Sequence, residues 1–360
     1  MIRSCDAGSL PFFGSMDMLS RGAEDFSKRL GSEQARFFER LIITAFSDKL
    51  RAGITIPSFP QLRDMSDMYT SSLDGVGKTE GGYVTAGDLS AKADGGIIPE
   101  VQAIAKNAEK IYGEIDKPFQ MAICVTGPYT LASLFRYKTG KILRKLGEAL
   151  SSIVESNIFN LKQGTVSLVT IDEPLFGVLD DPLIDRGSEG RENLLKAWET
   201  LASRARNRKA DACIHLHSTS DDLFWSVESL SVIESHVEDP IYKSKATKQH
   251  LMNEDKFLKA SIAITDFDKL IKAKLNQSSL EKLVADVWKE ISAGKAKPET
   301  FLEDVQSMKK RLSDILEQFG SDRVTLVGPE CGLRGFPTYV SAIECLRRVS
   351  TAAQENERKS

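Results

Sequence analysis

The sequence predicts an α/β protein, most simply a (β/α)8 barrel, also called a TIM barrel. Short runs rich in β-branched residues end in glycine, proline or an acidic residue, and longer amphipathic runs follow them. Strands that alternate with helices indicate a parallel sheet, and about eight such units fit into 360 residues. An open, doubly wound sheet is the alternative architecture for the same alternation.

Each expected strand combines β-branched or other apolar residues with a turn signal at its end. In chain order the expected strands are 2–8, 53–57, 119–126, 166–172, 211–217, 230–235, 259–264 and 323–328.

The expected helices are marked by a cap, by charge or by an apolar stripe, and they cover 32–52, 147–163, 192–208 and 299–319. Ser32 is suited to cap the first of them. Gly53, Gly164 and Gly320 follow three of these segments, and glycine is common just after a helix. The segment 192–208 ends in a basic turn, which the helix dipole favours.

Composition indicates a soluble globular protein, with 41% apolar and 28% charged residues and a net charge of −3. This charge gives no reason to expect nucleic acid or a membrane surface as a partner. No apolar run has the length of a signal peptide or a membrane span, so we expect a cytoplasmic protein. We expect one catalytic domain over 1–350 and a polar tail over 351–360.

The five cysteines are scattered and odd in number, which argues against a disulfide framework. In a reducing compartment each cysteine is then either a small buried apolar residue or a working thiolate.

Two of the four histidines lie in "CIHLHSTS", residues 213–220. Side chains two residues apart on a strand share a face, so His215 and His217 point the same way. They lie at the carboxyl end of their strand, which in a parallel barrel is the end that carries the active site. Two imidazoles there can bind a metal, and two hydrogen-bonded histidines at the start of a loop are the simpler interpretation.

Other strand ends carry chemistry as well: Ser9 in "SCDAGSLP", Thr126 in "VTGPYTLA", Asp172 and Glu173 in "TIDEPLF", Glu234 in "SVIES", and Glu330 and Cys331 in "LVGPECGLRG". Two histidines, one glutamate and one cysteine at strand ends make a plausible tetrahedral zinc set. Taken singly, an acid before proline is often a turn or cap residue, and a lone cysteine is more often buried than bound to a metal.

The motifs "GSLP", "TGPYTLA", "IDEP", "HLHSTS", "VIES" and "PECGLR" occur in this order. In this arrangement the chain resembles the C-terminal catalytic barrel of cobalamin-independent methionine synthase. The resemblance runs from about residue 4 to about residue 337 and is weak over 60–118 and 236–300. It implies a barrel of the methionine synthase and uroporphyrinogen decarboxylase type.

By position, the resemblance implies zinc ligands at His215, His217, Glu234 and Cys331. It implies that Asp172, Ser9 and Glu173 bind the amino-acid end of homocysteine, with Asp172 and His215 also acting in catalysis. The chain departs from the family at His217, where the family has cysteine. Zinc with one carboxylate and one thiolate is formally neutral, so a bound thiol should lose its proton more readily and give a weaker nucleophile.

The function that follows is a zinc-dependent thiol S-methyltransferase, with homocysteine as the expected acceptor and methionine as its product. Two other classes remain open. One is a zinc-free enzyme of the uroporphyrinogen decarboxylase type. The other is a non-catalytic protein that binds a thiol or a corrinoid.

The expected methyl donor is methylcobalamin or a methylated corrinoid protein. The family's full-length enzyme has an N-terminal half that helps to bind folate, and this chain has no such half, no "HGE" strand end and no tryptophan in its first third. Methyltetrahydrofolate bound through other residues is the alternative donor. Arg63 and Asp64 are candidates for shaping the donor surface, and a turn followed by a helix start explains them equally well.

Overall fold

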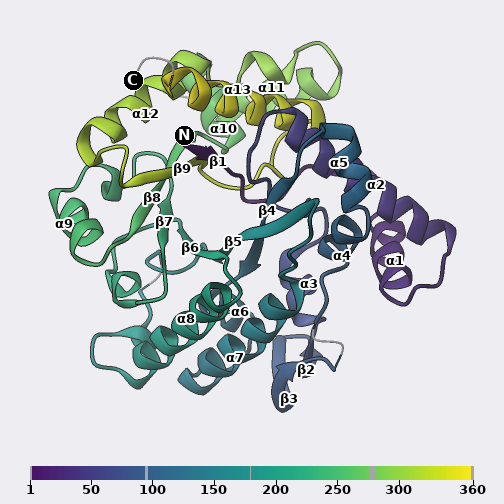
Figure 1. Cartoon of the computed structure of the whole chain (residues 1–360), viewed down its shortest axis with the longest axis vertical. Coiled ribbons are helices and arrows are strands. Elements are labelled where there is room, and N and C mark those ends of the chain that lie inside the picture. The colour runs from purple at the N-terminus through teal and green to yellow at the C-terminus, as the bar shows by residue number, and fades with distance from the viewer. Residues whose placement is uncertain (1, 94–95, 179, 276–280, 358–360) are drawn as a thin grey trace.

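The computed structural model describes residues 2–93, 96–178, 180–275 and 281–357. In these residues seven parallel strands form one curled sheet, in the order β1-β9-β8-β7-β6-β5-β4. Helices surround the sheet on its outside (Figure 1). The strands are β1 (Arg3–Ser4), β4 (Phe119–Thr126), β5 (Gly164–Glu173), β6 (Asp211–Leu216), β7 (Val232–Ser235), β8 (Phe257–Ala263) and β9 (Val324–Pro329).

Six expected strands are confirmed to within two residues at each end, and the seventh, expected over 2–8, is shortened to β1. The remaining expected strand, 53–57, is present only as isolated bridges between the two edges of the sheet. Ile56 N donates to Ser4 O of β1 (2.8 Å), and Ala122 N of β4 donates to Pro57 O (3.0 Å). Pro57 has no N–H and interrupts regular pairing at this point. The described residues therefore show a curled sheet with seven strands and not the complete eight-stranded barrel.

The helices of the described residues are α1 (Met16–Ser27), α2 (Glu33–Arg51), α3 (Met65–Thr70), α4 (Pro99–Lys106), α5 (Ala108–Ile115), α6 (Pro128–Ala132), α7 (Gly140–Asn157), α8 (Glu189–Asn207), α9 (Lys245–Asn253), α10 (Phe267–Leu275), α11 (Glu281–Ser292), α12 (Val305–Phe319) and α13 (Tyr339–Glu357). Ser32 caps α2 as expected. The helix expected over 147–163 begins earlier, because the Thr139 side chain accepts from Ile142 N. The helix expected over 299–319 begins later, because Asp304 is its N-cap.

A helix extends into the segment 351–360, which was expected to be a polar tail. Helix α13 continues to Glu357, and Ala352 and Ala353 on it are buried. Residues 358–360 lie outside the described residues. The last turns of α13 therefore belong to the packed structure.

The hairpin of β2 (Leu73–Thr79) and β3 (Gly82–Ala91) was not expected from the sequence. It pairs with the segment after α6, where Tyr83 N donates to Leu134 O (2.9 Å) and Arg136 N donates to Tyr83 O (2.8 Å). A cavity of about 590 Å³ lies between β3, the segment 135–139 and the first turns of α7. The hairpin projects from the rest of the molecule next to α7 (Figure 1).

Among the helices that the structure describes, none combines the length and the apolar character needed to cross a membrane.

Candidate metal centre

A row of three polar side chains crosses the carboxyl ends of neighbouring strands. Asp172 of β5 lies beside His215 of β6, and His215 lies beside Glu234 of β7. Paired residues of a parallel sheet point to the same face. Asp172 Oδ1 lies 3.8 Å from His215 Nε2, and Glu234 Oε2 lies 3.5 Å from His215 Nδ1. His215 is therefore the centre of a polar row on the inner face of the curled sheet.

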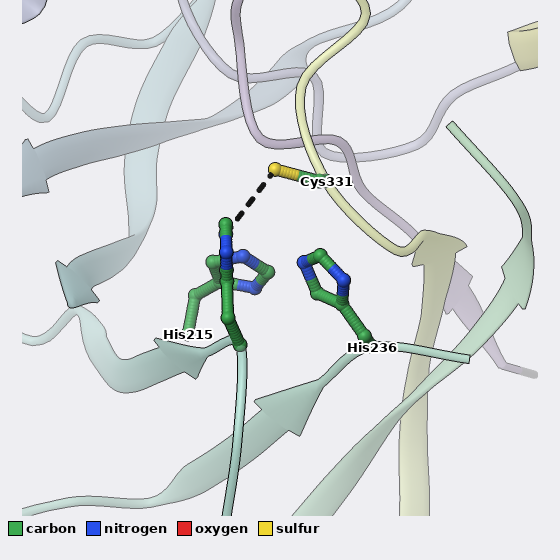
Figure 2. Close-up of side chains that lie close together, drawn as sticks. His215, His236 and Cys331 are labelled. Atoms are coloured by element: carbon green, nitrogen blue, oxygen red, sulfur yellow. Dashed lines mark hydrogen bonds between the residues drawn. The ribbon is translucent and has the colours of Figure 1, made fainter. Parts of the chain in front are cut away.

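His215 also belongs to a second group, which consists of three histidines and one cysteine. The potential ligand atoms of His215, His217, His236 and Cys331 all lie within 4.8 Å of one another. Cys331 Sγ lies 3.6 Å from His217 Nε2, and the His217 and His236 ring centroids are 4.1 Å apart. Figure 2 shows the side chains of His215, His236 and Cys331 pointing toward one another from separate parts of the chain. The structure thus brings together three of the four expected metal ligands and adds His236.

Strand ends and one turn position these four residues. His217 and His236 follow the ends of β6 and β7, each two residues beyond an inward-facing residue of its strand. Cys331 lies in the turn after β9, where Glu330 N donates to Ala263 O (2.9 Å) and Leu333 N donates to Ser9 O (3.0 Å). The ligand group therefore lies where the chain leaves three different strands.

Two of the imidazoles have a carboxylate behind them. Glu234 lies next to Nδ1 of His215, and Glu330 Oε2 lies 4.0 Å from Nδ1 of His236. Glu330 is itself held in place, because its carboxylate accepts from the backbone N–H groups of Val237 and Thr265 (2.9 Å each). A carboxylate behind Nδ1 orients the ring and leaves Nε2 for a metal.

Unpartnered atoms test whether these residues fit a metal ion. Both ring nitrogens of His215 and the Nε2 of His236 are buried, and none of these three atoms has a hydrogen-bond partner among the described residues. Buried polar atoms nearly always have a partner, and an ion is one explanation for those that do not. Imidazole and thiolate are the ligands that zinc prefers. The residues present therefore fit a zinc ion.

The protonation of two of the three rings, His217 and His236, also suits a metal. Burial and the neighbouring charge of His215 lower the pKa of His217 to about 3 and the pKa of His236 to about 4. Both rings are then uncharged at neutral pH, which is the form that binds a metal. Burial opposes a charge on His215, but Glu234, Cys331 and Asp172 outweigh it and raise the pKa of His215. This ring therefore favours its protonated form, and a metal has to displace that proton in order to bind.

Glu234, the fourth ligand expected from the sequence, is not part of this group. Its carboxylate forms an ion pair with Lys259 of β8, and both side chains are buried. Burial opposes the charge of Glu234, but Lys259 and His215 outweigh it and lower the pKa of Glu234. His236, which was not among the ligands expected from the sequence, lies where a fourth ligand is needed. The sequence feature that could have indicated it is the spacing of Glu234 and His236 in "ESH", which equals the spacing of the two histidines in "HLH".

The two expected substrate-binding residues Asp172 and Ser9 both lie near the ligand group. The Asp172 side chain is 20% exposed at the edge of the His215 row. Ser9 lies beside the turn that carries Cys331, and a Cβ at Gly332 would overlap Ser9 Oγ. Glycine at this position therefore lets the Cys331 turn approach Ser9.

Glu173, also expected to bind substrate, points to the opposite face from Asp172 and is fully buried. Its carboxylate accepts from Tyr129 N (2.9 Å), Thr130 N (2.8 Å), Thr130 Oγ1 (2.7 Å) and Trp198 Nε1 (2.8 Å). A Cβ at Gly127 would overlap this carboxylate. In the structure Glu173 therefore holds the start of α6 against α8.

Two of the remaining candidates, Arg63 and Asp64, have structural partners. Arg63 forms an ion pair with the buried Glu100 (2.8 Å), and Asp64 caps α3 by accepting from Asp67 N (3.0 Å). Thr126, at the end of β4, is buried, and its Oγ1 has no hydrogen-bond partner among the described residues. The helix start at Asp64 matches the simpler interpretation of that segment.

No protein-family model and no curated protein sequence matches the chain. Solved structures are similar to it in fold. A B12-independent methionine synthase from Shewanella sp. W3-18-1, in complex with selenomethionine, has a TM-score of 0.60 and 13% identity, and the match covers 100% of this chain and 98% of that one. A methyltransferase from Methanosarcina mazei has a TM-score of 0.54 and 13% identity, with 98% and 94% covered. At these identities the comparison establishes shared architecture, and this chain has the fold of those two structures.

Proposed function

We propose that the chain is a zinc-dependent S-methyltransferase that moves a methyl group to a thiol, with homocysteine as the acceptor and methionine as the product. The observation that supports this most directly is the convergence of three imidazoles and one thiol at the carboxyl ends of parallel strands. This is the end of such a sheet at which catalytic residues gather. The fold shared with a methionine synthase and a methyltransferase supports the same class of reaction.

In this proposal His215, His217 and Cys331 hold the metal, and Glu234 or His236 supplies the remaining position. The chemistry that zinc would supply there, when bound, is a lower pKa for a coordinated thiol, so that the thiolate nucleophile would be available at neutral pH. The thiol loses its proton, its sulfur forms a bond to the methyl carbon, and the electron pair of the broken bond stays with the donor. The side chains mainly activate the thiol and position it.

The amino-acid end of the acceptor is assigned to Asp172 and Ser9. The partly exposed carboxylate of Asp172 lies 3.8 Å from His215, so an ammonium group bound to it is held beside the metal ligands. Ser9 lies next to the Cys331 turn, and its hydroxyl is suited to a carboxylate. Because Glu173 is fully buried with its oxygens in hydrogen bonds, we assign it to positioning α6 instead.

The test is zinc-edge X-ray absorption with and without homocysteine, together with an assay for methionine formed from a panel of labelled methyl donors. We expect bound zinc with nitrogen and sulfur ligands, an additional sulfur when homocysteine is present, and transfer of label to methionine. A protein that binds no zinc, or whose zinc gains no sulfur and which methylates no thiol, would overturn the proposal.

A further inference from the structure

We infer that Lys259 decides which side chain completes the metal site: it holds Glu234 away from the metal, and His236 takes the fourth position. This inference rests on the metal site of the proposed function and specifies its composition. Lys259 is a positioning residue, because it acts through Glu234.

The Lys259–Glu234 pair is built into the interior of the sheet. Only 3% of the Lys259 side chain and 2% of the Glu234 side chain are exposed. Glu234 directs one carboxylate oxygen to Lys259 Nζ and places the other 3.5 Å from His215 Nδ1. Both oxygens therefore already have a cationic or polar neighbour, Lys259 for one and His215 for the other.

The path of the lysine side chain depends on a glycine in the next strand. Gly328 of β9 faces Lys259, and a Cβ at this position would lie 2.5 Å from Lys259 Cε. Any larger residue at 328 would displace the lysine. The same Cβ would overlap the backbone oxygen of Cys5, so glycine at 328 leaves room both for the neighbouring backbone and for the buried lysine that reaches Glu234.

Energetics favour keeping this pair intact. If Glu234 turned toward the metal, the buried ammonium of Lys259 would lose its carboxylate, and an unpaired buried charge is strongly destabilising. His236 differs in this respect: its Nε2 is buried and has neither a hydrogen bond nor an ion pair among the described residues, whereas Glu234 Oε1, which also lacks a hydrogen bond, is paired with Lys259. Glu330 already lies behind Nδ1 of His236. The imidazole is thus free to bind, whereas the carboxylate is engaged.

The consequence is a metal site with different charge. Three neutral imidazoles and one thiolate leave a bound Zn²⁺ with a formal charge of +1, whereas a site with Glu234 in place of His236 would be neutral. An incoming thiolate neutralises the first site and makes the second anionic. Lys259 therefore favours thiolate binding, although it does not itself touch the thiol.

The experiment compares zinc affinity, by competition with a chelator, and the zinc-edge spectrum in the full chain. His236→Ala should weaken zinc binding by at least about tenfold and remove one imidazole from the spectrum. Lys259→Met should free Glu234, add a carboxylate oxygen to the spectrum, and shrink the effect of a second His236→Ala change to less than about threefold. Lys259→Met combined with Glu234→Gln removes both buried charges and should keep the original ligand set.

Lys256→Met is the matched control. Lys256 is also buried, but it donates to the backbone oxygens of Val227 (2.6 Å) and Leu230 (3.1 Å) near the start of β8. This variant should be destabilised, yet it should keep the zinc affinity and spectrum of the unaltered protein. Circular dichroism identifies variants that fail to fold, and the double variant, which leaves no buried charge unpaired, keeps the inference testable if Lys259→Met is one of them.

Two results would overturn the inference. The first is a zinc affinity that stays within about twofold in His236→Ala, together with loss of zinc when Lys259→Met is combined with Glu234→Gln. This result would place Glu234 on the metal and leave the proposed methyl transfer intact. Failure of the unaltered protein to bind zinc would remove both the inference and the proposed function.

Discussion

Cys331 Sγ lies 3.6 Å from His217 Nε2, although 114 residues separate them and their strands are not neighbours in the sheet. Strands β7 and β8 lie between β6 and β9, so in a flat sheet the two side chains would stand about 14 Å apart. The curl of the sheet brings the ends of β6 and β9 much closer together than this. The ligand group therefore depends on the curvature of the sheet, and it should be sensitive to changes at the strand ends.

Replacing Cys331 tests the thiolate ligand. Cys331→Ala should release most of the zinc and end turnover, because the remaining imidazoles supply no anionic ligand. The free energy of unfolding without metal should change by less than about 1 kcal/mol, since Cys331 is only partly buried. Zinc content and a denaturation curve measure both. Cys345→Ala, a buried cysteine of α13, is the control and should keep its zinc. Full zinc occupancy in Cys331→Ala would refute the assignment.

His217 offers a change toward the family pattern. His217→Cys should keep the metal and raise the apparent pKa for thiol binding, because an added anionic ligand disfavours a second thiolate. The measurement is the pH dependence of homocysteine binding in the two proteins. If the two pH profiles coincide, His217 does not bind the metal.

The sequence predicted the strands well and the site in part, for reasons that lie in particular residues. The strands β4 to β9 are apolar runs whose signal is local. The hairpin is rich in glycine and exposed, so it carries no such signal. The different roles of Asp172 and Glu173 could have been predicted from the sequence, because neighbours on a strand face opposite sides and only one of them can line the site. The partner of Glu234 could not have been predicted, because pairing with Lys259 depends on how β7 and β8 pack.

Asp172 is the test of amino-acid recognition. Asp172→Asn should weaken binding of homocysteine by about 10- to 100-fold, because a charged hydrogen bond to the ammonium is lost. A thiol of equal length that lacks the ammonium should lose less than about threefold. Competition binding of both thiols gives the ratio. Equal loss for both thiols would assign Asp172 a structural role.

Glu173 should affect stability and not substrate binding. In Glu173→Gln an amide N–H group would face the N–H and O–H groups that now donate to the carboxylate. This should lower the free energy of unfolding by about 1–3 kcal/mol. The KM for homocysteine should change by less than about twofold. Denaturation and steady-state assays check both expectations. A large rise in KM with unchanged stability would restore the role in substrate binding.

The same residue predicts a pH dependence of stability. Burial, against four hydrogen bonds, raises the pKa of Glu173 from 4.5 to about 7. A raised pKa means that the folded protein favours the protonated form. The contribution of Glu173 to the free energy of unfolding is therefore complete below about pH 4.5. It is lost as the pH rises through about 7, a change of about 3 kcal/mol. Denaturation curves between these pH values should show this slope in the unaltered protein and a flatter one in Glu173→Gln. Equal slopes would mean that Glu173 is ionised throughout.

The methyl donor separates two versions of the proposed reaction, and we expect a methylcorrinoid to be used in preference to methyltetrahydrofolate. The segment 57–89 carries no tryptophan and forms α3 and most of the hairpin, while Trp198 is buried against Glu173 and Trp288 donates to Asp268. When a cobalt–methyl bond breaks, cobalt keeps the electron pair and needs no proton, whereas the nitrogen of a folate does. The His217 and His236 rings are uncharged at neutral pH and cannot supply that proton, and His215, whose pKa is raised, is assigned to the metal, so a donor that needs no acid suits this site.

With homocysteine as acceptor, the rate from methylcobalamin should exceed the rate from methyltetrahydrofolate by at least about tenfold, a difference of about 1.4 kcal/mol in activation free energy. The rate with Cys331→Ala measures the uncatalysed background for each donor and is subtracted. Efficient turnover with the folate, and none above background with the corrinoid, would show that the chain uses a folate donor.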